Sequence, residues 1–365
     1  MEMSLQQPIP TENAPAKRTS WWGYILKYVV PLVITVGLCW LLFHDVDVKQ
    51  MFHIITTECN FWWIVAALAV SILGHVARAA RWQLQLNALD IRPGLWPLTL
   101  SIFGTYAVNL VFPRLGEVWR TGWIAKRQNA PFSKVFGSMV ADRLTDTLTV
   151  ACLVVLSFIL AARQMLAYLG VHEDAQSPGG GLSPWVLVTI ALVVIVGIIV
   201  VRRMRHTAVM QRTKKMLTGL WQGFSVVLHM KGRGRFLLLT VALYGCYFMQ
   251  LYLAFFAFPQ TALVVERHGA TAVLVCFVLS SLAMAVPSNG GLGPWQWSIV
   301  FGLSLYSAGQ PLLTQDYAAA FANLVMGMQT LLLIVLGIFT FICIALQKKK
   351  GDTVPFNPQP NVSEQ

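Results

Sequence analysis

The chain has 365 residues, of which 56% are hydrophobic and 12% are charged. A soluble globular domain has roughly a quarter of its residues charged, so this composition excludes that class and indicates an integral membrane protein. The net charge of +12 would suggest nucleic acid as a partner of a soluble protein. Here the basic residues stand in short connections beside apolar segments, which favours membrane orientation and anionic lipid headgroups over nucleic acid.

Residues 1–20 are polar, lack the apolar core of a signal peptide, and are expected to form a cytoplasmic tail. The six cysteines form no Cys-x-x-Cys pair and mostly lie in apolar runs, which predicts buried side chains rather than disulfides or a zinc site. Neither a His-Glu-x-x-His motif nor a Gly-x-x-x-x-Gly-Lys loop occurs. We therefore expect neither a metal nor a cofactor.

Several apolar segments are close to the ~20 residues that cross a bilayer, and six are expected to be full spans: 24–43, 61–80, 135–162, 184–201, 236–258 and 318–346. The connection 44–60 is acidic and is placed outside, whereas the strongly basic connection 202–235 is placed in the cytoplasm. Arg78 and Arg81 at the end of the second span are expected to mark its cytoplasmic boundary. Residues 21–346 would form one membrane domain, followed by a cytoplasmic tail, 347–365.

Residues 95–112 resemble a further span, but the charge distribution argues against a complete crossing. If this segment crossed, the basic connection 202–235 would lie outside, against the positive-inside rule. The conflict disappears if 95–112 enters from the cytoplasm and returns through a turn at Pro113 and Gly116. Irregular backbone at membrane depth lies against protein or in a watery cavity, so this turn is predicted to border a polar cavity.

A second interrupted element comprises 272–287, a Gly-rich turn at 288–293 and an apolar helix to residue 307. Short apolar pieces separated by Pro and Gly are typical of discontinuous membrane helices. An interfacial hairpin between two spans fits equally well. The predicted class is therefore an all-α polytopic membrane protein with about six full spans and two re-entrant or broken hairpins. Entry from opposite sides would be consistent with an inverted repeat.

Ionisable residues gather in 109–146, between apolar segments, where such residues usually meet a partner, a substrate or water. Asp142 lies ~12 Å into its helix if that helix starts near Lys134, and it shares a face with Asp146. Arg120 also fits a position at headgroup level. If the two turns converge, the substrate-binding residues would be Asn109, Arg114, Glu117, Arg120, Asp142, Arg143, Asp146, Ser288, Asn289, Gly291 and Gly293.

Three motifs carry a family resemblance: Asn-x-x-x-Pro-Arg-x-Gly-Glu-x-x-Arg at 109–120, Asp-Arg-x-x-Asp at 142–146 and Pro-Ser-Asn-Gly-Gly-Leu-Gly at 287–293. Over about 21–346 the chain resembles the lysylphosphatidylglycerol synthase transmembrane family, which includes the flippase domain of the multiple peptide resistance factor. The resemblance implies movement of an anionic or modified lipid between leaflets of a bacterial inner membrane. Two features depart from the family. Gln296 stands at a position where the family commonly has Asp or Glu. The aminoacyl-transferring members carry a large soluble catalytic domain, whereas only 19 residues follow residue 346 here. Lysyl transfer by this chain alone is therefore not expected.

The function expected from these observations is a flippase-like transporter, not an enzyme, for an anionic phospholipid or a prenyl-phosphate lipid. Arginines would bind the headgroup, and the carboxylates would hold the arginines while the site is empty. One alternative is a metal-dependent enzyme acting on a lipid phosphate, with Mg²⁺ held by Glu117, Asp142 and Asp146, which the neighbouring arginines disfavour. Another is a non-transporting partner of a lipid-modifying enzyme. Association of the chain with copies of itself, as a homo-oligomer, is a further alternative.

Overall fold

A computed structural model describes residues 47–112, 115–168, 232–286, 288, 291–307 and 310–351. Within these ranges the chain forms ten helices and no strand, which confirms the predicted all-α class. The predicted spans 24–43 and 184–201 and the tail 1–20 lie outside the described residues. Most of the basic connection 202–235 also lies outside them, as do Arg114 and Asn289.

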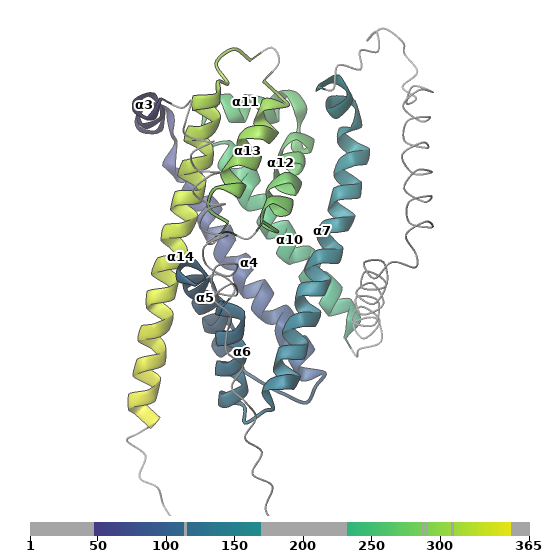
Figure 1. The fold of residues 1–365 in the computed structure, drawn as a ribbon, viewed down its shortest axis with the longest axis vertical. Helices are drawn as coiled ribbons and strands as arrows, with labels where there is room; N and C mark the ends of the chain where they lie inside the picture. Colours follow the sequence, from purple (N-terminus) through teal and green to yellow (C-terminus); the bar gives the residue numbers. More distant parts are fainter. Residues whose placement is uncertain are drawn as a thin grey trace, which may run out of the picture.

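Four long helices form the frame of the molecule: α4 (Phe61–Asn87), α7 (Phe132–Tyr168), α10 (Arg233–Phe255) and α14 (Gln315–Gly351). Each contains a stretch long and apolar enough to cross a membrane. They run along the long axis of the molecule, and α4 packs most extensively against α10 (Figure 1). They correspond to four of the predicted spans, so the chain is a multi-pass membrane protein.

Polar contacts define the two ends of this frame. At one end, called the α3 end, Asp47 Oδ1 caps α3 (Val48–Glu58), and the Asp47 amide donates to Asp316 Oδ1 at 3.0 Å. Tyr317 donates to Glu58 Oε2 there at 2.7 Å. At the opposite end, called the α6 end, Arg127 Nη1 donates to Gln347 Oε1 at 3.1 Å. Helix α3 is a difference from the sequence-based expectation, which treated residues 44–60 as a connection.

Helices α5 (Leu95–Val111) and α6 (Leu115–Arg127) stand on the two sides of the predicted turn, whose Pro113 lies outside the described residues. The Gly116 amide donates to Asn109 Oδ1 at 2.8 Å, and a Cβ at position 116 would collide with the Thr105 carbonyl. Gln83 Nε2 donates a hydrogen bond of 2.8 Å to the Pro93 carbonyl, which holds the start of α5 beside the end of α4. Because α6 returns to the same end, the hairpin does not cross the molecule, as predicted. Helix α6 itself was not predicted from the sequence.

The second predicted interruption separates α12 (Ala270–Ala283) from α13 (Pro294–Ser304). Gly291 and Gly293 in the turn have φ of +87° and +89°, values that only glycine adopts readily. A short helix not predicted from the sequence, α11 (Pro259–His268), precedes α12 and makes an angle of 112° with it. The α12–α13 hairpin occupies the half of the molecule toward the α3 end, and α5–α6 the other half (Figure 1). An inverted repeat stays a prediction.

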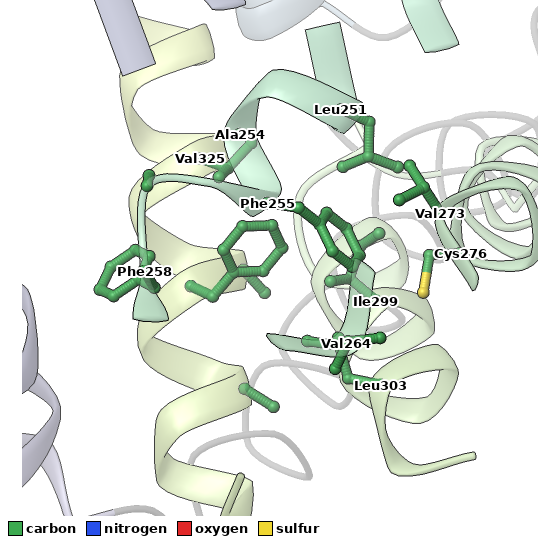
Figure 2. Close-up of a cluster of buried hydrophobic side chains, with 14 of the residues drawn as sticks. Leu251, Ala254, Phe255, Phe258, Val264, Val273, Cys276, Ile299, Leu303 and Val325 are labelled. Atoms are coloured by element: carbon green, nitrogen blue, oxygen red, sulfur yellow. The ribbon is translucent and has the colours of Figure 1, made fainter. Parts of the chain in front are cut away.

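Two apolar cores hold these parts together. The larger lies between α10, α12, α13 and α14, where Phe255 packs edge-on against Phe321 with ring centroids 5.1 Å apart. Figure 2 shows this core around Phe255, Ile299 and the buried Cys276. The smaller core surrounds Trp82 between α4, α5, α6 and α7. It supports the polar side chains described next.

Candidate functional site

Two arginines of α4 meet two aspartates of α7 inside the protein. Arg81 Nη2 lies 2.6 Å from Asp142 Oδ1 and 2.6 Å from Asp146 Oδ1. Arg78 Nη1 lies 2.8 Å from Asp146 Oδ2 and 3.5 Å from Asp142 Oδ2. The arginines are three residues apart and the aspartates four, so each pair lies on one helix face. Facing helices with this spacing form a crossed network in which each arginine contacts both carboxylates.

The expectation that Arg78 and Arg81 mark a cytoplasmic boundary is therefore wrong. Helix α4 continues to Asn87, and both arginines are buried against α7 rather than exposed at a helix end. Long cationic side chains reach water when they can, but here the carboxylates replace water as partners. The signal available in the sequence was the match between the Arg-x-x-Arg face of α4 and the Asp-x-x-x-Asp face of α7.

Arg120 of α6 brings a third guanidinium into this region. Its side chain is 1% exposed, its Cζ lies 4.5 Å from the Trp82 ring centroid, and its Nη2 lies 3.9 Å from Asp142 Oδ2. Trp82 is fixed by a 3.0 Å hydrogen bond from Nε1 to Ser138 Oγ. Within the part of the chain that the structure describes, the Arg120 atoms Nε and Nη2 have no hydrogen-bond partner. The Arg120 side chain is thus held inside the protein rather than extended toward water, and its depth in the membrane stays a prediction.

Glu117 and Arg143 form an ion pair at the edge of the same group. The Arg143 side chain is 41% exposed and that of Glu117 is 17% exposed. Arg143 Nη1 also lies 3.9 Å from Asp146 Oδ2. This pair therefore connects the buried ion pairs to the surface of the protein.

Seven residues thus make one arginine–carboxylate cluster: Arg78, Arg81, Glu117, Arg120, Asp142, Arg143 and Asp146. With four arginines and three carboxylates it carries one excess positive charge. Several of its buried polar atoms lack a hydrogen-bond partner among the described residues, namely Arg81 Nε and Nη1, Arg120 Nε and Nη2, and Asp142 Oδ2. Such groups usually find a partner in a protein, in water or in a ligand. The excess charge and the surplus of donors favour an anion.

Helix α10 supports the cluster with two tyrosines. Arg78 Nε donates to the Tyr247 hydroxyl at 3.1 Å, and the Tyr244 hydroxyl donates to the Asp146 carbonyl at 3.1 Å. These contacts orient Arg78 and anchor α7 to α10. Within the described residues no group of three His, Cys, Asp or Glu side chains is arranged to hold a metal ion. The three carboxylates that a Mg²⁺ site would use are instead paired with arginines.

Comparison with known proteins identifies the family. The family described as lysylphosphatidylglycerol synthase TM region matches residues 28–337. The chain belongs to this family. It is also 26% identical over 141 residues to the protein named glycosyltransferase AglD from Haloferax volcanii, a match that covers 36% of this chain and 22% of that relative. No solved structure matches. The expectation that the chain is not an enzyme is contradicted by this relative, which is named as a transferase.

The family motif at 109–120 has both structural and charged members. Asn109 closes the α5–α6 hairpin by accepting from the Gly116 amide, and the described residues show no hydrogen bond from Asn109 to the cluster. Glu117 and Arg120, one turn further, enter the cluster. Asp142 and Asp146 of the second family motif form its centre. The predicted grouping of these four charged residues with Arg143 is thus present in the structure.

The third family motif is described only at Ser288 and at 291–293. Ser288 is half-buried, with its Oγ 3.5 Å from the Val286 carbonyl, and Gly291 lies against Met284 and Met326. Among the described residues, no hydrogen bond or ion pair joins Ser288, Gly291 or Gly293 to the cluster. Gln296 Oε1 accepts from the Gly293 amide at 2.8 Å and caps α13. The amide oxygen of Gln296 thus makes a capping contact that a carboxylate could also make.

Proposed function

We propose that this protein binds the anionic headgroup of a membrane lipid at the arginine–carboxylate cluster and moves that lipid between leaflets. Membership of a family named for a phospholipid synthase supports a lipid as the substrate. The observation that carries the proposal is Arg120, the buried guanidinium that gives the cluster its one excess positive charge and whose Nε and Nη2 have no hydrogen-bond partner among the described residues. Guanidinium groups bind phosphate through paired, charge-assisted hydrogen bonds.

The geometry supports a simple cycle. Without lipid, Asp142 and Asp146 neutralise Arg78 and Arg81, which lowers the cost of keeping these charges away from water. An anionic headgroup competes for the same guanidinium groups and engages the free donors of Arg120. The half-exposed Arg143 is placed to meet the headgroup first. The acyl or prenyl chains stay in the bilayer throughout.

The distribution of exposed charge supports an orientation for this cycle. Arg92, Lys126 and Arg127 are exposed toward the α6 end, while Asp47 and Asp316 lie at the α3 end. By the positive-inside rule the α6 end faces the cytoplasm. The cluster would then be reached from the cytoplasmic side, in the inner membrane of a bacterium.

A second candidate is a membrane module of a transferase that acts on a lipid substrate. The match to the protein named glycosyltransferase AglD favours it. In that case the cluster would hold the lipid phosphate while a group is transferred to or from the lipid. The chain spans about a fifth of that relative's length, as the 22% coverage states.

The proposal is tested with the purified protein in liposomes that contain fluorescent phosphatidylglycerol, by the rate at which label leaves the outer leaflet. Arg120→Gln should slow this exchange about ten-fold or more, because a hydrogen bond to a charged group contributes roughly 1.5–3 kcal/mol. Arg92→Gln, which removes an exposed arginine outside the cluster, should leave the rate unchanged. Equal rates in all three proteins would overturn the proposal. A covalent change in the labelled lipid, seen by chromatography, would support the transferase.

A further inference from the structure

A second buried polar network links α10, α14 and α4 away from the ion pairs. Gln250 Nε2 donates to Gln329 Oε1 at 2.9 Å, and Gln329 Nε2 donates to Ser71 Oγ at 3.0 Å. Ser71 Oγ lies 3.5 Å from His75 Nε2. The network therefore runs from Gln250 of α10, through Gln329 of α14 and Ser71 of α4, to the imidazole of His75.

His75 is almost completely enclosed. It is 3% exposed, and none of the residues that the structure describes gives its Nδ1 a hydrogen-bond partner. Its ring lies 4.8 Å from the Tyr106 ring on α5 and 6.5 Å from the Tyr247 ring on α10, measured between centroids. A neutral imidazole has one donor and one acceptor nitrogen, so Ser71 satisfies one nitrogen and the other stays unused.

The groups that face His75 tie it to the cluster. On its own helix Arg78 is three residues away and so lies on the same face. Tyr106 on α5 and Tyr247 on α10 are the titratable groups of the neighbouring helices, and α14 contributes the neutral Gln329. Tyr247 contacts the His75 ring with its own ring and accepts from Arg78 Nε with its hydroxyl. The α7 carboxylates Asp142 and Asp146 are bound to Arg78.

We propose that His75 is a proton-binding site whose occupancy is coupled to the binding of an anionic headgroup at the cluster. This inference rests on the proposed function and names the second ligand of that site. One proton adds to the ring nitrogen that carries no hydrogen, and no other bond changes. Burial of the ring, and secondarily the Arg78 guanidinium, whose charge Asp142 and Asp146 only partly offset, disfavour this step in the empty protein. An anion bound at the cluster adds negative charge next to Arg78 and favours it.

The coupling is reciprocal. If the anion raises the affinity of His75 for a proton, then a proton on His75 raises the affinity of the cluster for the anion by the same factor. Lipid binding should therefore strengthen as the pH falls. A network that only joined the helices, as polar pairs in membranes often do, would show no such dependence.

The direct test is an NMR titration of histidine side chains in the full-length chain, in nanodiscs of phosphatidylcholine alone or mixed with phosphatidylglycerol. The His75 signal is assigned by its loss in His75→Asn or His75→Gln. We expect the His75 midpoint to rise by about one pH unit with phosphatidylglycerol, a ten-fold gain in proton affinity. The same midpoint in both lipids, or no titration of His75 in either, would overturn the inference.

A transport measurement separates this inference from the proposed function. The exchange of fluorescent phosphatidylglycerol should be faster at the most acidic pH at which the protein stays folded than at pH 8, both in the wild type and in His53→Asn, which changes an exposed histidine of α3. In His75→Asn the rates at the two pH values should be equal. If the wild type exchanges lipid at a rate that does not depend on pH, the proton site is contradicted and the proposed lipid transport is not. If the His75 midpoint shifts but the protein exchanges no lipid, lipid transport is contradicted and the proton site is not.

Discussion

Arg81 Nη2 lies 2.6 Å from Asp142 Oδ1, and neither side chain exposes any surface to solvent. Two opposite charges so placed stabilise each other, but each is costly to leave alone. Asp142 also faces Arg78 and Arg120, so a single carboxylate balances parts of three guanidinium groups. The cluster therefore depends on Asp142 more than on any exposed member.

Asp142→Asn should destabilise the protein strongly, because it removes a negative charge and leaves Arg81 with Asp146 as its remaining carboxylate. Removing one partner of a buried pair costs about 3–5 kcal/mol, so the thermal unfolding midpoint of the purified protein should fall clearly. Asp90→Asn is the matched control. Asp90 is exposed and has a φ of 61°, which asparagine tolerates, so its midpoint should not change.

The same logic predicts the outcome of removing both charges. A double variant, Arg81→Met with Asp142→Leu, should unfold at a higher temperature than Asp142→Asn, since an apolar pair leaves no isolated charge from these two positions. It should also lose lipid exchange. A double variant less stable than the single one would show that Arg81 and Asp142 do not act as a pair.

Gly116→Ala should disrupt the α5–α6 hairpin, because the added Cβ collides with the Thr105 carbonyl and contacts the Asn109 side chain. Overpacking of this kind typically costs about 1–3 kcal/mol. Gly122→Ala in the same helix is the control: nothing lies within 4 Å of its new Cβ. That change should be neutral or stabilising, given the higher helix propensity of alanine. Thermal unfolding of both variants checks the difference, and equal midpoints would contradict the close approach.

Gln296→Ala should weaken the start of α13 because it removes the acceptor of the Gly293 amide. The loss of such a cap costs about 0.5–2 kcal/mol. Gln296→Glu keeps an acceptor at the same distance along the chain and adds a negative charge near a helix N-terminus, which is favourable. Unfolding midpoints should therefore rank Gln296→Glu at or above the wild type and Gln296→Ala below it. The reverse order would exclude capping as the role of this side chain.

Cysteine labelling can test whether the α5–α6 hairpin enters and leaves the membrane on the same side. In a chain whose six native cysteines have been replaced, Arg92→Cys and Lys126→Cys should react with a membrane-impermeant maleimide from the same side, since both ends of the hairpin lie at the α6 end. Lys49→Cys, at the start of α3, should react from the other side. Reaction of positions 92 and 126 from opposite sides would mean that α5 crosses the membrane.

Charge placement allowed much of this fold to be predicted. The hairpin after residue 112 followed from keeping the basic connections on one side, and Asp142, Arg143 and Asp146 followed from their depth in an apolar helix. Arg78 and Arg81 were misplaced because a count of about 20 apolar residues ends α4 too early, and only the packing of α4 on α7 extends it. Helices α3 and α11 were missed because they are short, and their residues are too polar for a membrane span.

Helix α14 contacts both hairpins. Its Gly337 lies against Ala107 of α5, Thr340 donates to the Leu100 carbonyl at 3.4 Å, and its first half packs against α13. A continuous helix is stiff along its axis, so the contacts of α14 with α5 and with α13 are mechanically linked. If the protein moves lipid as proposed, a displacement of one hairpin would therefore strain the packing of the other, and the two hairpins would not move independently.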